Sequence, residues 1–144
     1  MTLTSSTSLR TGVVKTFRCP PRLSLIRPFL LDVVRELKRR PEMHLTDPTY
    51  ESICAYIIGY DHCLLAVGKG DVGLDGFREW IVARNGGGVE SHWIELIATL
   101  AGTPDATDLR KRDTLFTLFE EFWIDRDARG VQAITDDFNA TLGH

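Results

Sequence analysis

Cysteines are few and long apolar runs are missing, and both features limit the class of protein. The 144 residues hold three cysteines, an odd number without a CxxC pair that cannot form a complete disulfide set. Cys54 and Cys63 fall in one predicted helix, about 13 Å apart by helical rise, which is too far for a disulfide. No apolar run approaches the ~20 residues of a membrane span, and the polar start lacks the apolar core of a secretory signal. The expected location is therefore the reducing cytoplasm.

Patterns typical of metal binding and catalysis are missing as well. No two histidines have the i, i+3 or i, i+4 spacing of a helical metal site, and the glycines of 86–88 are not followed by GKS or GKT. Ser91 and His92 are adjacent, but no GxSxG turn precedes them. We therefore predict no metal, no cofactor and no catalytic residue. An enzyme is the third hypothesis, and it requires His62 or His92 within about 3 Å of a carboxylate.

Length and composition predict a single globular domain. A chain of 144 residues can bury roughly 68–70% of its unfolded surface, which is enough for a core without disulfides. Apolar residues make up 43% of the chain and charged residues 26%, as in ordinary globular proteins. We place the helical domain at residues 22–144. Residues 1–21 are rich in Ser and Thr and are interpreted as a loose, basic arm, with a short strand over 12–17 as an open alternative.

Six segments between Gly/Pro loops have apolar residues at helical spacing. Pro28 suits a first helical turn, and Asp47 followed by Pro48 offers an N-cap and a first helical residue. The predicted helices cover about 28–40, 48–66, 74–84, 89–101, 108 or 113 to 125, and 130–142. Strand alternation and a fixed repeat are both missing. The sequence therefore predicts an all-α, single-domain bundle of about five to six amphipathic helices.

Net charge changes sign along the chain. Residues 1–47 carry nine Lys/Arg and four Asp/Glu, residues 48–112 carry six and nine, and residues 113–144 carry two and seven. An acidic surface repels nucleic acid and speeds association with basic proteins, although it also keeps a small protein soluble. The basic cluster at 38–40 lies at a helix C-terminus, where it suits the helix dipole. Direct binding of nucleic acid is therefore not predicted.

The stretch 115–127, LFTLFEEFWIDRD, combines aromatic and acidic residues most densely. As a helix it buries Phe116, Phe119 and Phe122 on one side and displays carboxylates on the other. The acidic side continues into the last helix. Candidate partner-binding residues are Glu120, Glu121, Trp123, Asp125, Asp127, Asp136 and Asp137.

Five short motifs occur here in the same order as in a group of small bacterial proteins. They are RRPEMHL at 39–45, YIIGYDH at 56–62, FREWI at 77–81, ESHWIELI at 90–97 and LFTLFEEF at 115–122. The chain thus resembles, over about residues 35–124, proteins found among the immunity proteins of polymorphic toxin and contact-dependent growth inhibition systems. It departs from their pattern at His44, where Tyr is usual, and at Thr46, where Gly is usual.

This resemblance implies a non-catalytic binding protein that neutralises a cognate toxin domain by covering its active site. If the toxin is a nuclease, its groove is basic, and the acidic candidates can stand in for phosphates. Trp123 is the expected anchor if its side chain is exposed. The alternative is a small regulatory or adaptor protein that forms a homodimer through the same aromatic helix.

Overall fold

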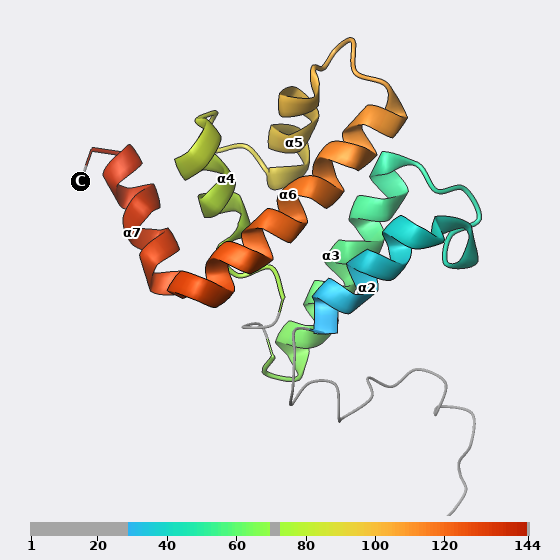
Figure 1. Cartoon of the computed structure of the whole chain (residues 1–144), viewed down its shortest axis with the longest axis horizontal. Coiled ribbons are helices and arrows are strands. Elements are labelled where there is room, and N and C mark those ends of the chain that lie inside the picture. Colours follow the sequence, from blue (N-terminus) through green and yellow to red (C-terminus); the bar gives the residue numbers. More distant parts are fainter. Residues whose placement is uncertain (1–28, 70–72, 144) are drawn as a thin grey trace, which may run out of the picture.

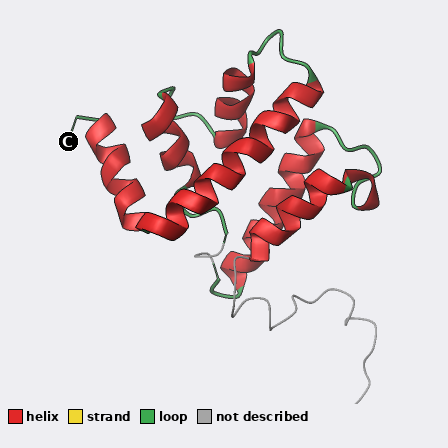
Figure 2. Ribbon diagram, viewed as in Figure 1, coloured by secondary structure: helices red, strands yellow, loops and turns green. Residues whose placement is uncertain are grey.

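Helix α6 (Asp108–Arg129) crosses the middle of the molecule and contacts each of the other α-helices (Figure 1). The structure, a computed structural model, describes residues 29–69 and 73–143. The other helices in them are α2 (Phe29–Arg39), α3 (Tyr50–Ala66), α4 (Phe77–Asn85), α5 (Trp93–Ala101), α7 (Val131–Thr141) and the 3₁₀ turn η2 (Pro41–Met43). These residues contain no strand (Figure 2), so the all-α prediction is confirmed. The predicted arm, the alternative strand over 12–17 and residues 22–28 lie outside the described residues.

Aromatic rings from α4 and α6 form the centre of the core. Phe119 and Phe122 are fully buried, and their ring centroids lie 5.3 and 5.0 Å from that of Phe77. Trp80 packs edge-on against Phe122 at 5.8 Å. Burying an aromatic side chain of this size contributes roughly 1.5–3 kcal/mol. The predicted inward face of the aromatic helix is therefore confirmed, and these rings are not available for self-association.

The first turn of α3 is capped differently from the prediction. Thr49, rather than Asp47, is the N-cap, and its side chain accepts a hydrogen bond from the backbone N–H of Ser52 at 3.2 Å. In return, the Ser52 hydroxyl accepts from the backbone N–H of Thr49 at 2.9 Å. This reciprocal pair satisfies two backbone donors at once, so the helix begins at Tyr50, after Asp47 and Pro48.

Local capping also shifts the ends of α4, α5 and α6. Gly76 has a left-handed φ of 87°, so α4 begins at Phe77 and not near residue 74. His92 caps α5 by accepting a hydrogen bond from the N–H of Ile94 at its Nδ1 atom, and that helix begins four residues later than predicted, at Trp93. Helix α6 continues past residue 125 to Arg129, because burial of the Arg126 side chain holds one further turn against the core.

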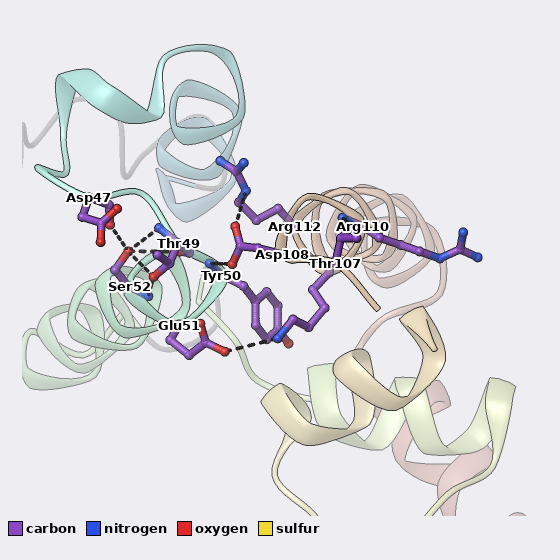
Figure 3. Close-up of polar contacts among 10 residues, drawn as sticks. Asp47, Thr49, Tyr50, Glu51, Ser52, Thr107, Asp108, Arg110 and Arg112 are labelled. Atoms are coloured by element: carbon purple, nitrogen blue, oxygen red, sulfur yellow. Dashed lines mark hydrogen bonds and ion pairs between the residues drawn. The ribbon is translucent and has the colours of Figure 1, made fainter. Parts of the chain in front are cut away.

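The N-termini of α3 and α6 are joined by one carboxylate (Figure 3). Asp108, in the first turn of α6, accepts a hydrogen bond from the backbone N–H of Tyr50 at 2.7 Å, and its other oxygen lies 3.1 Å from Nε of Arg112. The Lys111 ammonium lies 5.3 Å from the centroid of the Tyr50 ring and 3.4 Å from a Glu51 oxygen. Negative charge is favourable at a helix N-terminus, and Asp108 supplies it to two helices.

Candidate partner-binding surface

The six acidic candidates lie on the C-terminal half of α6 and on α7, and we call them the acidic surface. They are Glu120, Glu121, Asp125, Asp127, Asp136 and Asp137. Arg129 joins the two helices because its guanidinium contacts Asp125 at 2.7 Å and Asp137 at 2.8 Å. Carboxylates from two separate predicted helices are thus brought together.

Arginines neutralise part of this surface. Arg35 of α2 binds Glu120 through two hydrogen bonds of 2.7 and 3.0 Å, and this contact holds the pKa of the Glu120 carboxyl below its usual value. Arg84 of α4 lies 3.8 Å from Glu121. Together with Arg129, three arginines therefore face six carboxylates. The surface is less acidic than the sequence alone suggests.

Asp125 is held from two directions. Its carboxylate accepts two hydrogen bonds from Arg129 and a third from Nε1 of the buried Trp80 at 2.9 Å. The hydrogen bonds from Arg129 are the main cause of its lowered pKa, and the bond from Trp80 acts in the same direction. Asp125 therefore satisfies a buried indole donor, which is a structural role.

Asp127 and Asp136 are the carboxylates least engaged in ion pairs. Both are exposed, and neither has an ion pair within the described residues. Asp136 accepts a hydrogen bond from the side-chain amide of Gln132 at 3.0 Å. With the loosely paired Glu121, they are the groups most available to a basic partner.

Trp123 does not meet the condition set for an anchor. Its side chain is only 5% exposed and packs against Phe119 and Phe122, while the neighbouring Ile124 is 67% exposed. Helical spacing explains this difference, because the core-facing positions 119, 122, 123 and 126 leave residue 124 on the opposite side. The same spacing could have identified Ile124 from the sequence. The exposed large apolar side chain among the acidic residues of α6 is therefore Ile124.

Arg126 is buried, which the sequence analysis did not anticipate. It is 7% exposed, and its guanidinium donates hydrogen bonds to the backbone oxygens of Asp75 and Gly73, the second at 3.0 Å. The guanidinium carbon lies 4.0 Å from the centroid of Trp123 and 4.8 Å from that of Phe122. Arg126 thus fastens the loop before α4 to the aromatic core.

The histidines considered for chemistry do not meet an acid in the residues that the structure describes. Neither His62 nor His92 hydrogen-bonds to a carboxylate in the described part of the chain, and no group of three metal-ligating side chains occurs there. Burial raises the pKa of the Cys54 thiol to about 12, which keeps it protonated at neutral pH. Its neighbour Tyr50 donates its hydroxyl to the backbone oxygen of Ile94 at 2.6 Å. Cys54 and Tyr50 thus contribute to packing, and His92 caps α5.

The chain matches no protein-family model, no curated protein and no solved structure. Among the described residues, no helix has the length and apolar character needed to cross a membrane. The functional assignment therefore depends on the surface itself, and its distinctive feature is an exposed isoleucine on the central helix with carboxylates one helical turn away on both sides.

Proposed function

We propose that the chain is a non-catalytic binding protein of the immunity type, which neutralises a cognate bacterial toxin domain in the cytoplasm by covering a basic active-site groove. The single observation that carries the proposal is Ile124, 67% exposed on α6 with acidic residues one helical turn away on both sides. An apolar anchor within a ring of charge is the usual arrangement of a strong protein interface. The motifs shared with immunity proteins point to the same class.

The two kinds of side chain have separate roles in this proposal. Glu121, Asp127 and Asp136 supply negative charge that steers a basic partner and speeds association. Ile124 supplies apolar area, worth roughly 1.5–3 kcal/mol if fully buried, and this slows dissociation. Glu120 stays with Arg35 of α2 and Asp125 with the indole of Trp80 of α4, and both contacts hold α6 in position.

The packing of α6 against its neighbouring helices also favours this proposal. Helix α6 packs against α2, α3, α4, α5 and α7. A partner that binds the acidic surface therefore meets side chains on a fixed backbone, and little conformational entropy is lost on binding.

The test is to purify the protein encoded by the neighbouring gene, in a catalytically inactive form if it is toxic, and to measure association and dissociation rates. We expect Ile124→Ala to raise the dissociation rate about tenfold, since the loss of an apolar contact of about 1.4 kcal/mol corresponds to that factor. Asp127→Lys should chiefly slow association and weaken its dependence on salt.

Matched controls are available at the other end of the same helix. Leu109 is 59% exposed, and Asp113 is an exposed carboxylate. Leu109→Ala and Asp113→Lys should leave both rates nearly unchanged. Absence of a complex at micromolar concentration would sink the proposal, and equal effects of test and control variants would move the interface away from Ile124.

A further inference from the structure

Helix α4 ends in an asparagine that is followed by three glycines. Asn85 is the last residue of α4, and both Asn85 and residues 86–88 are exposed. An asparagine before a glycine can react with its own backbone, because glycine has no side chain to hinder the approach of its nitrogen to the asparagine amide. The only other asparagine of the chain, Asn139, is followed by an alanine. The single Asn-Gly pair therefore lies at an exposed helix end.

Two atoms of this pair have to meet, the backbone nitrogen of Gly86 and the side-chain carbon Cγ of Asn85. The space around Gly86 is open, since a Cβ added there would have no described atom within 4 Å. The Asn85 side chain donates a hydrogen bond from Nδ2 to the backbone oxygen of Ile81 at 3.3 Å. A bond of this length lies beyond the usual range of N–H···O bonds and restrains the side chain only weakly.

The main restraint on the reaction is the last hydrogen bond of the helix. The Gly86 N–H donates to the backbone oxygen of Val82 at 2.8 Å, and this bond must open before the nitrogen can turn towards the Asn85 side chain. Gly86 itself, with a φ of 76°, is already outside the helix. Because helix ends fray and open locally, the reaction requires movement of the end of α4 and not unfolding of the core.

We propose that Asn85 is a site of spontaneous deamidation through a succinimide formed with Gly86. The Gly86 nitrogen gives its proton to a solvent base and bonds to Cγ of Asn85. The bond from Cγ to Nδ2 breaks, and Nδ2 takes up a proton from water and leaves as ammonia. Water then adds to either carbonyl carbon of the five-membered ring, which opens to aspartate or isoaspartate at position 85. The net reaction consumes water and releases ammonia, without oxidation or reduction.

The product carries a carboxylate at a position that disfavours it. The C-terminal end of a helix dipole is negative, and a carboxylate cannot donate to the Ile81 oxygen as the amide does. The preceding residue, Arg84, lies 3.8 Å from Glu121, and its guanidinium carbon lies 4.7 Å from the centroid of the Trp80 ring. The reaction therefore changes the charge beside the acidic surface as the protein ages. It does not depend on the proposed toxin partner.

The first test follows the full chain during incubation in mildly alkaline buffer. Tryptic peptides are separated and weighed, because conversion replaces the mass of an amide by that of a carboxyl group. We expect conversion at Asn85, faster at higher pH because more of the Gly86 amide is deprotonated, while Asn139 stays intact as the internal control. The folded chain should react at most about tenfold more slowly than the chain in urea, since opening one terminal hydrogen bond accounts for that factor.

Two variants separate the reaction from its consequence. Asn85→Gln keeps an amide at this position but needs a larger ring, so its peptide should stay intact in the folded chain and in urea. Asn85→Asp carries the product, and the amide protons in the last turn of α4 should exchange with solvent faster than in the parent.

Three results would overturn the proposal. Conversion of Asn85 in the folded chain no faster than that of Asn139 would show that the Asn-Gly pair has no special reactivity. A folded chain that is protected far beyond the effect of one hydrogen bond would show that the end of α4 stays closed. Unchanged exchange in Asn85→Asp would show that the new charge does not loosen the helix end.

Discussion

Arg126 brings a charged group into an interior made of aromatic rings. Two backbone carbonyls accept its hydrogen bonds, and two rings lie against its guanidinium plane. An arginine suits this position better than a lysine because its planar group stacks on rings and its donors diverge. The helical spacing of residues 119, 122 and 126 does place it on the inner face. Its charge, within the acidic string DRD, favours exposure instead.

Removing this side chain should therefore weaken the fold. We expect Arg126→Ala to lower the free energy of unfolding by about 2–3 kcal/mol, since two carbonyls lose their donor and two ring contacts disappear. Urea unfolding followed by tryptophan fluorescence measures the change. Arg39→Ala is the control, because Arg39 pairs with Glu36 on an exposed helix face and its loss should change stability by less than about 0.5 kcal/mol. Equal losses in the two variants would contradict the assigned role.

At the scale of helices, apolar spacing was enough to locate the six α-helices that the structure describes, but their ends depended on details that spacing does not contain. The beginning of α3 is decided by the pair of Thr49 and Ser52, and that of α5 by the ring nitrogen of His92. Several residues near each predicted start could serve as caps, and the sequence does not rank them. Inward and outward faces were more predictable, because they follow from the same period that predicts the helix.

Two glycines with opposite environments provide a test at this scale. Gly76 has a φ of 87°, and an added Cβ would lie 3.2 Å from Val131 of α7, whereas Gly59 is helical and open. We expect Gly76→Ala to lower the free energy of unfolding by about 1–2 kcal/mol and Gly59→Ala to raise it by about 0.5–1 kcal/mol. Thermal unfolding at low micromolar concentration compares the two. A stabilised Gly76→Ala variant would mean that the turn before α4 does not need its left-handed residue.

At the scale of the whole molecule, part of the charge gradient along the sequence is used in ion pairs within the molecule. Helix α2 lies beside α6, and its Arg35 meets Glu120 across 85 positions of sequence. The difference in charge between the two ends of the chain suggested a basic partner. Part of this charge instead holds α2 and α6 together. Such long-range ion pairs could not be foreseen, because they depend on which helices become neighbours. The exposure of Ile124 could have been foreseen from helical spacing. The same spacing places Trp123 on the buried face, so the condition set for Trp123 as an anchor is not met.

These ion pairs predict acid sensitivity. Hydrogen bonds from arginines lower the pKa of Glu120 and Asp125 in the folded chain. As the pH falls, these two carboxyls therefore bind protons in the unfolded chain before they do so in the folded chain. Their contribution to the free energy of unfolding is complete above about pH 4.5 and is lost as the pH falls through the pKa values of the folded chain. We expect the double variant Glu120→Gln, Asp125→Asn to be less stable at pH 7 and to lose less stability between pH 5 and about 3.

Urea unfolding at several pH values measures this slope. Glu36, whose pKa is lowered by Arg39 and Arg40, should preserve part of the slope in the double variant. Asp113→Asn removes an exposed carboxylate at the opposite end of α6 and serves as the control. The ion pairs would have no part in acid sensitivity if the double variant and the control had the same slope.

The carboxylate of Asp108 has a consequence for the order of folding. Asp108 lies 58 residues after Tyr50 in the sequence and accepts the hydrogen bond of the Tyr50 backbone N–H. The first turn of α3 therefore gains this bond only when α6 has docked. Closing this loop costs conformational entropy that forming either helix alone does not. The amide protons at the beginning of α3 should then exchange with solvent together with those of α6, as one cooperative unit, although the two segments are far apart in the sequence.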